Sequence, residues 1–188
     1  MYARNLGGRE FTFDFASGLI DDNLLIVDRE TDSVWSQLAG RAVSGEMDGT
    51  PLEQMPSLQT TWGFWREQHP DTRVMVVEGS DGRPYQYQDF VPGERRSRGG
   101  EHDTSTLGLG LAIGGESWFY PLDELAKVET PIATTIGGQR RSIHYSAAGL
   151  TAWATDASGT TLVSVIAYRR GWGKFFPESN YFAGGQLP

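Results

Sequence analysis

The chain contains no cysteine, so its 188 residues form neither a disulfide nor a thiolate catalytic or metal site. Histidine is scarce as well, with three residues at His69, His102 and His144. These positions lack the H-x-x-x-H spacing that places two zinc ligands on one helix face. A metal site built from the three histidines is therefore an alternative that no close spacing supports.

Long apolar runs and basic charge are also missing. No stretch approaches the roughly 20 apolar residues of a spanning helix, so we expect no membrane span. The start of the chain has no apolar run, so we expect no signal peptide here and a soluble chain of unspecified compartment. The 16 basic residues are outnumbered by 24 acidic ones, which gives a net charge of −8. Because nucleic acids and anionic lipids attract basic surfaces, we expect neither as a partner.

Glycine, by contrast, is abundant, and its 24 residues favour turns between short strands. Gly-Gly pairs at 7–8, 114–115 and 137–138 predict hairpin turns. Apolar patterns predict strands at 9–16, 24–27, 34–38, 41–45, 52–58, 73–77, 107–113, 117–122, 132–136, 140–145, 150–155 and 162–168. Short helices are expected at 60–68, at 123–127 and around Trp172 and Phe176. The sum predicts a mainly β fold (or α+β) of short antiparallel strands with two or three short helices.

In the first of these strands, Phe11, Phe13 and Phe15 alternate with polar residues and should share one face. The strand's partner would be the residues before Gly7, and only six are present, which suggests that the chain is truncated. A strand with an unpaired edge and an apolar face is prone to pair with another chain. We therefore expect that this strand can mediate self-association.

One tryptophan-containing segment occurs twice. The residues W-R-E-Q-H-P-D-T at 65–72 are similar to W-G-K-F-F-P-E-S at 172–179. This similarity predicts two diverged structural repeats, at 1–78 and 107–182, separated by a loop at 79–106 and followed by a tail at 183–188. A loop of that length is unusual inside a compact domain, so it is either functional or a linker.

The sequence also resembles a known family. The runs S-G-L-I-D-D-N-L-L-I-V-D-R-E-T-D-S-V-W-S-Q-L-A-G-R-A-V-S-G (17–45) and L-Q-T-T-W-G-F-W-R-E-Q-H-P-D-T (58–72) resemble segments of a bacterial and archaeal family, domain of unknown function 3179. G-G-E-S-W-F-Y-P-L at 114–122 is similar to that family's G-G-E-A-x-A-Y-P-L hairpin, and 135–138 is similar to its second glycine turn. The resemblance implies no settled activity.

The resemblance further implies an N-terminal part that this chain lacks. In the family, the segment before Tyr2 usually carries another copy of the G-G-E-x-x-A-Y-P-L unit and a C-P-x-C motif. The matching position of the second repeat, near His144, Tyr145 and Ser146, has no cysteine. One hypothesis is therefore a truncated form of a metal- or redox-dependent enzyme whose cysteine pair lies upstream of Met1.

Within the chain itself, chemistry is best sought where the two repeats differ, in the polar turn and strand at 28–37. The candidate ligand-binding residues are Asp28, Arg29, Thr31, Trp35 and Gln37. Arginine and glutamine offer planar donors to a carboxylate, phosphate or sugar, and the tryptophan offers an aromatic floor. The alternative is structural, with an Arg–Asp pair that fixes the turn and Trp35 in the core. No catalytic residue or cofactor is indicated.

The remaining aromatic residues allow two interpretations. Trp62 and Trp65, together with Arg169 and Trp172 in the second repeat, could line a groove for planar ligands. Their helical spacing favours core packing instead. The leading functional hypothesis is a small-ligand-binding module. The alternatives are the truncated enzyme and a structural or interaction repeat protein, so whether the chain is an enzyme stays open.

Overall fold

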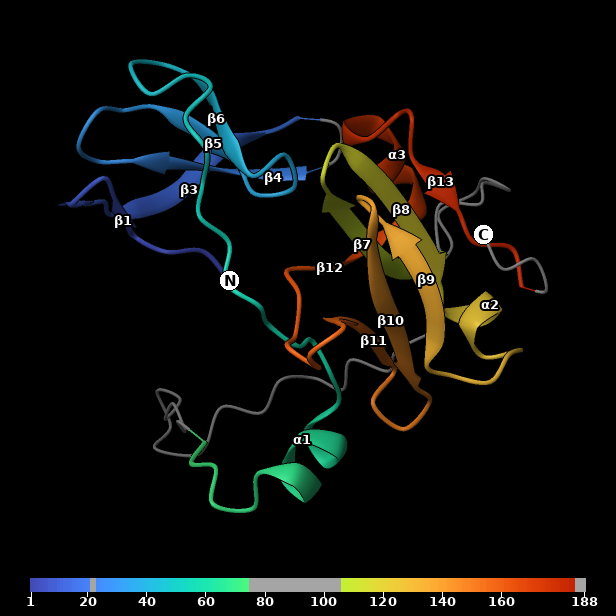
Figure 1. The fold of residues 1–188 in the computed structure, drawn as a ribbon. Coiled ribbons are helices and arrows are strands. Elements are labelled where there is room, and N and C mark those ends of the chain that lie inside the picture. Colours follow the sequence, from blue (N-terminus) through green and yellow to red (C-terminus); the bar gives the residue numbers. More distant parts are fainter. Residues whose placement is uncertain (21–22, 75–105, 185–188) are drawn as a thin grey trace, which may run out of the picture.

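The computed structural model describes residues 1–20, 23–74 and 106–184 (Figure 1). Antiparallel strands dominate these residues. The helices of the described ranges are short: α1 (Trp62–Gln68), α2 (Leu122–Leu125) and α3 (Arg169–Phe175). The predicted mainly β fold class is thereby confirmed. No helix within the described ranges has the length and apolar character needed to cross a membrane.

The N-terminal part forms one four-stranded antiparallel sheet. Its strands are β3 (Phe13–Ile20), β4 (Asn23–Asp28), β5 (Val34–Ser36) and β6 (Arg41–Ser44), in that spatial order. A small hairpin of β1 (Asn5–Leu6) and β2 (Arg9–Glu10) precedes it. The core of this part contains Phe11, Ile26, Trp35, Ala42 and Leu52.

The C-terminal part contains two sheets. The first has the order β12-β7-β8-β13, with β7 (Leu107–Ile113), β8 (Glu116–Pro121), β12 (Val165–Tyr168) and β13 (Asn180–Tyr181). The second has the order β11-β10-β9, with β9 (Ile132–Ile136), β10 (Gln139–Ser146) and β11 (Thr151–Asp156). Residues of both sheets, with Leu125 of α2 and Phe182, form a second core cluster. The two cores are separate, although the division into structural repeats stays a prediction.

The glycine pairs form the turns that the sequence predicts. Gly114 and Gly115 join β7 to β8 with φ angles of 62° and 82°. Gly137 and Gly138 join β9 to β10 with φ angles of 60° and 69°. Positive φ at both central residues matches the right-handed twist of the flanking strands and is costly for other residue types. The local sequence therefore specifies these two hairpins.

The first strand differs from its prediction. Phe11 lies between β2 and β3 and is 1% exposed, whereas Phe15 in β3 is 77% exposed. Phe11 and Phe13 do lie together, with stacked rings whose centroids are 6.3 Å apart, but the chain leaves the extended ladder between Glu10 and Phe13, and Phe15 does not join them in the core. Phe13 packs edge-on against Trp35, with ring centroids 5.7 Å apart. Self-association through this strand, which lies at an edge of its sheet, stays a prediction.

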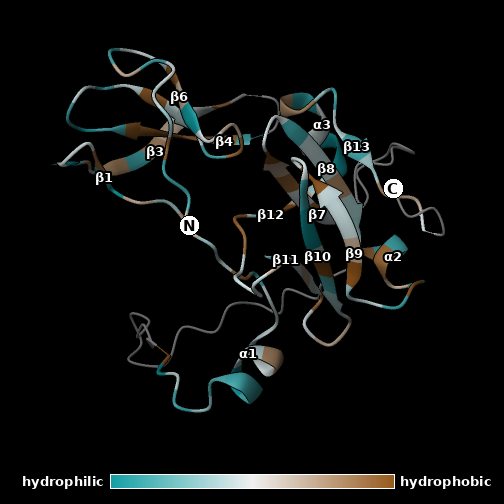
Figure 2. Ribbon diagram, viewed as in Figure 1, coloured by the Kyte–Doolittle hydropathy of each residue, from teal (hydrophilic) through white to brown (hydrophobic). Residues whose placement is uncertain are grey.

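Two other predicted strands are absent from the described ranges. Residues 52–58 make only an isolated bridge between Gln54 and Tyr2 and otherwise run as irregular chain, and Arg73 and Val74 are not in a strand. The rest of 73–77, and nearly all of the predicted loop at 79–106, lie outside the described residues. The helix at 60–68 is confirmed as α1, which begins after Thr61 and changes from apolar to polar residues along its length (Figure 2).

Candidate functional site

The polar turn at 28–33 is organised around the carboxylate of Asp28, which has no exposed surface. Its Oδ2 accepts a 2.7 Å hydrogen bond from Trp35 Nε1, and its Oδ1 accepts one of 2.6 Å from the backbone N–H of Thr31. The Thr31 hydroxyl donates to Oδ1 at 2.8 Å. Burial raises the pKa of Asp28, but these hydrogen bonds outweigh burial and hold the pKa below its usual range. The carboxylate is therefore ionised at neutral pH and bound by its own turn.

The same network reaches the loop after β6. The hydroxyl oxygens of Thr31 and Ser33 lie 2.7 Å apart, and Ser33 Oγ accepts a 3.0 Å hydrogen bond from the backbone N–H of Met47. Gly45 has a φ of 93°, and a Cβ at this position would lie 2.6 Å from Ser33 Oγ. The Asp28 network thus fixes two turns of the N-terminal sheet against each other.

Arg29 leaves this network and binds a neighbouring strand. Its guanidinium donates through both Nε and Nη2 to the carboxylate of Asp14 in β3. The hydrogen bond from Arg29 lowers the pKa of the Asp14 carboxyl, and Asp14 in turn raises the pKa of Arg29. Both side chains are well exposed, so this pair lies on the outer face of the sheet.

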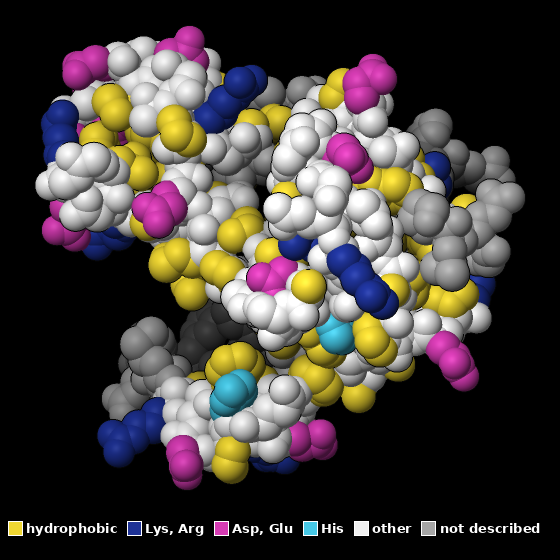
Figure 3. All heavy atoms as spheres, in the orientation of Figure 1, with side chains coloured by type: hydrophobic (Ala, Val, Ile, Leu, Met, Phe, Trp, Pro, Cys, Tyr) yellow, Lys and Arg dark blue, Asp and Glu magenta, His cyan; other side chains and the backbone are white. Residues whose placement is uncertain are grey.

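A cavity of about 400 Å³ lies between the N-terminal part and β12. Its walls combine hydroxyl and amide side chains with aliphatic ones: Tyr2, Asn23, Gln37, Gln54, Ser57, Gln59 and Ser164 with Leu38, Leu109, Val163, Val165 and Ile166, among others. None of the described residues that line it is Asp, Glu, Lys, Arg or His. Figure 3 shows hydrophobic side chains gathered where the N-terminal part faces the rest of the molecule.

One wall of the cavity is the edge of a sheet. β12 is the outermost strand of the order β12-β7-β8-β13, and the consecutive residues from Val163 to Tyr168 all line the cavity. Side chains of a strand alternate between two faces, so a cavity that reaches every consecutive residue must border the strand's edge. The backbone groups of an edge strand that do not bind the neighbouring strand are directed away from the sheet. The cavity therefore meets main-chain donors and acceptors as well as side chains.

The opposite wall is held in place by Tyr2. Its hydroxyl donates to the backbone carbonyl of Gln37 and accepts a 3.0 Å hydrogen bond from Gln54 Nε2. Burial raises the pKa of Tyr2, so the phenol remains a neutral donor. These contacts join the N-terminal segment, the turn after β5 and the irregular 52–58 segment into one surface.

The histidines lie on different elements. His69 ends α1 and packs on Trp65, with ring centroids 4.0 Å apart and an interplanar angle of 34°. His144 in β10 stacks on Trp153, and its Nε2 lies 3.0 Å from Thr155 Oγ1. His102 lies outside the described residues. Among the residues that the structure describes, no three His, Cys, Asp or Glu side chains form a group that could hold a metal ion.

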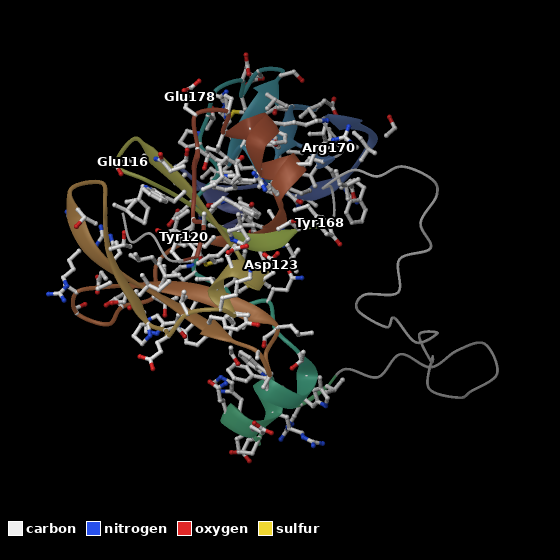
Figure 4. The ribbon with its side chains drawn as sticks, turned by 90° about the vertical axis from the view of Figure 1, so that its right-hand side faces the viewer. Glu116, Tyr120, Asp123, Tyr168, Arg170 and Glu178 are labelled. Atoms are coloured by element: carbon white, nitrogen blue, oxygen red, sulfur yellow. The ribbon has the colours of Figure 1, made fainter. Side chains whose placement is uncertain are left out.

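A second group of buried polar atoms belongs to strands of the two C-terminal sheets. It contains Trp118 Nε1 and the Tyr120 hydroxyl of β8, with Thr134 Oγ1 of β9 and Arg141 Nε of β10. Burial raises the pKa of Tyr120 to about 12, so its hydroxyl keeps its proton at neutral pH. Figure 4 shows Tyr120 in the interior, whereas Glu116 and Glu178 lie toward the periphery. At neutral pH these groups can donate hydrogen bonds, and none of them is a general base.

The five candidate residues predicted from the sequence therefore lie in three different places. Asp28, Thr31 and Trp35 lie together in one buried network, Arg29 pairs with Asp14, and Gln37 lines the cavity. Sequence analysis missed the rest of the cavity, because its walls come from segments that are far apart in the chain. The polar composition of 53–60, E-Q-M-P-S-L-Q-T, was the available signal, since a buried strand rarely carries so many amide and hydroxyl groups.

A comparison with known protein families identifies one match. A family model described as a protein of unknown function (DUF3179) matches residues 1–170. The chain belongs to the DUF3179 family. The match covers the whole N-terminal sheet, α1 and the strands from β7 to β12, so every cavity-lining residue except Gly171 falls within the family region. No curated protein and no solved structure matches the chain.

Proposed function

We propose that this DUF3179 chain binds a small neutral ligand in the cavity between its N-terminal part and β12. The observation that carries the proposal is the composition of the cavity walls, where amide and hydroxyl groups face aliphatic side chains without an acidic or basic one among the described lining. A volume of about 400 Å³ lies within the range of small-molecule sites.

The walls favour a ligand without formal charge. No charged side chain is among the described lining, so a charged group taken from water into this cavity would meet one charged partner, the terminal ammonium of Met1, which donates to Ser57 Oγ. Burying an unpaired charge is costly. Amide side chains offer both donors and acceptors, and so does the main chain at the edge of β12. A molecule with several hydroxyl or amide groups on an apolar frame, such as a capped short peptide or a sugar, fits this arrangement.

The turn and strand at 28–37, which were predicted from the sequence as a site, contribute to the proposed cavity in two ways. Gln37 lines the cavity directly, and its carbonyl oxygen is bound by Tyr2. Asp28, Thr31 and Trp35 contribute by holding the turn and strand that lead to Gln37. Arg29 is directed to Asp14 and has no place at the cavity in this proposal.

Titration calorimetry with two matched pairs of probes tests the proposal. The neutral probes are N-acetyl-dialanine methylamide and glucose, and the charged counterparts are free dialanine and glucose 6-phosphate. We expect saturable binding of at least one neutral probe and about tenfold weaker binding of its charged counterpart.

Two variants locate the site. Ala167→Phe adds a ring at a cavity-lining position and should abolish binding, whereas Gln68→Leu, on the exposed part of α1, should leave it unchanged. Binding that survives Ala167→Phe in a folded protein would place the ligand elsewhere. A preference for the charged probes would contradict the neutral-ligand proposal.

A further inference from the structure

Helices α1 and α3 end in the same local structure. Trp65 Nε1 donates a 2.9 Å hydrogen bond to Thr72 Oγ1, and Trp172 Nε1 donates one of 2.7 Å to Ser179 Oγ. In each case the acceptor lies seven residues after the tryptophan. The tryptophan side chain is therefore fixed by the turn that follows its own helix.

The rings and the helix ends agree as well. His69 packs on Trp65 with an interplanar angle of 34°, and Phe176 stacks on Trp172 with an angle of 23°; both pairs have ring centroids 4.0 Å apart. The C-cap residues have φ and ψ of −132° and 67° at His69 and −129° and 68° at Phe176. The two segments therefore agree in sequence and in local geometry, and each holds its tryptophan in the equivalent position.

In α3 this tryptophan is buried against a β-hairpin. Trp172 is 1% exposed and packs on β7 and β8. A Cβ at Gly110 of β7 would lie 2.4 Å from two ring carbons of Trp172, so the ring rests directly on the glycine backbone. The ring centroid of Phe119 in β8 lies 6.3 Å from that of Trp172. A glycine on one strand and an aromatic residue on the next form the receiving surface.

In α1 the corresponding tryptophan, Trp65, is only half-buried, and His69 beside it is exposed, among the residues that the structure describes. None of the residues of α1 is buried, and Trp62 is 48% exposed. The helix is attached through its N-terminal end, where the hydroxyls of Thr60 and Thr61 donate to the carbonyls of Gly149 and Ala148. Figures 1 and 4 both place α1 at the end of the molecule opposite α3.

We propose that the face of α1 that carries Trp65 and His69 is a docking surface for a β-hairpin of a partner polypeptide. The hairpin is of the β7–β8 type, with glycine on the strand that meets the helix and an aromatic residue on the adjoining strand. Within this molecule, the β7–β8 hairpin already covers the equivalent helix, α3, and the turn that follows it. His69 in place of Phe176 makes the α1 face more polar than that of α3, which suits a contact that forms and separates.

A second folded copy of the chain is a poorer occupant. Its own β7–β8 hairpin is already covered by Trp172, and the tight fit at Gly110 leaves no room for a second tryptophan. The proposal is independent of the cavity, because no α1 residue is among the cavity-lining residues.

The probe for this proposal is the chain's own hairpin as a peptide. Residues 107–121 are made as a backbone-cyclised peptide, and circular dichroism verifies its strand content before use. It is titrated into the ¹⁵N-labelled full chain while the indole N–H signals are followed by NMR. We expect a saturable shift of the Trp65 signal and no shift of Trp172.

Variants of both partners make the test specific. Trp65→Ala in the chain should abolish binding, which is followed for this variant by the backbone amide signals of α1. Gly110→Val in the peptide should weaken binding about tenfold, because a side chain there would meet the ring. Gln68→Ala, on the polar part of α1, should bind like the unchanged chain. Ala167→Phe, which fills the cavity, should also retain hairpin binding, so the two proposals can fail separately.

Three outcomes would overturn the docking surface. One is an unchanged Trp65 signal with a peptide of verified strand content. Another is equal binding of the Gly110→Val peptide. The last is a concentration-dependent shift of Trp65 in the chain alone, which would make a second copy the occupant.

Discussion

Trp35 Nε1 donates a 2.7 Å hydrogen bond to Oδ2 of Asp28, and neither side chain has any exposed surface. The pair joins the end of β4 to the middle of β5 and places an ionised carboxylate beside the aromatic core of the N-terminal sheet. A buried charge is stable here because its donors, the Trp35 indole of β5 and the Thr31 groups of its own turn, are already in place.

Removing this carboxylate should strongly destabilise the protein. Asp28→Ala leaves the buried Trp35 indole N–H and the partly buried Thr31 N–H without an acceptor, so we expect a loss of about 3 kcal/mol in the free energy of unfolding. Asp28→Asn retains one acceptor oxygen and should cost less. Urea denaturation followed by tryptophan fluorescence measures both. A midpoint for Asp28→Ala equal to that of the unchanged chain would contradict the structural role.

The same carboxylate predicts a pH dependence. The pKa of Asp28 is lower in the folded chain than in the unfolded one, so its stabilisation is present above about pH 4 and is lost as the pH falls toward the folded pKa. Other carboxyl groups with lowered pKa add to the acid slope. The test is therefore the difference in unfolding free energy between the unchanged chain and Asp28→Asn, measured from pH 6 to pH 3. It should shrink with acidification, and a constant difference would assign the effect to packing alone.

The exposed pair of Asp14 and Arg29 should behave differently. Solvent and salt screen such a pair, so Asp14→Asn should change the denaturation midpoint far less than Asp28→Asn does. The small effect should disappear when the measurement is repeated in 1 M NaCl. A large effect that persists in salt would indicate that the pair is more buried than its exposed fractions show.

Two glycines give opposite predictions for the same substitution. Gly110→Ala places a Cβ against the Trp172 ring and should destabilise the protein by about 2 kcal/mol. Gly63→Ala lies in α1, where a Cβ meets nothing within 4 Å, and should stabilise that helix by up to about 1 kcal/mol. Hydrogen exchange of α1 and global denaturation separate the two effects. Equal changes of the same sign would contradict the packing of Trp172 on β7.

Removing the hydroxyl acceptors of the two tryptophans should also give unequal results. Ser179→Ala leaves the indole N–H of Trp172 buried without that acceptor, and we expect a cost of about 2 kcal/mol. Thr72→Ala exposes the indole N–H of Trp65 to water, which replaces the lost acceptor. Its effect should be below about 0.5 kcal/mol. Thermal denaturation of the two variants provides the comparison.

Several local features followed from the sequence alone. The Gly-Gly turns, the short alternating strands and the helix after Thr61 depend on backbone freedom, side-chain period and capping, which act over a few residues. The mainly β class and the family resemblance follow from such segments taken together. The likeness of the two tryptophan segments extends to hydrogen bonds and ring contacts, because both carry the hydroxyl and the ring that their tryptophan needs.

Features that join distant segments depended on the tertiary structure. Phe11 and Phe15 have the same place in the alternating pattern, yet Phe11 is in the core and Phe15 is exposed. Arg29 pairs with Asp14 on the neighbouring strand and not with the adjacent Asp28, because strand pairing, not sequence separation, sets the distance between these charges.

The cavity shows the same division. Gln37 was selected from the sequence as a polar residue beside a turn, but the walls that surround it come from Tyr2, the 52–59 segment and the edge of β12. No local pattern relates residues so far apart, since their contact arises only when the two parts of the molecule pack together. The sequence by itself determined the class of fold, the glycine turns and the likeness of the segments that contain Trp65 and Trp172. The tertiary structure decided which polar groups meet at one site and which tryptophan is covered.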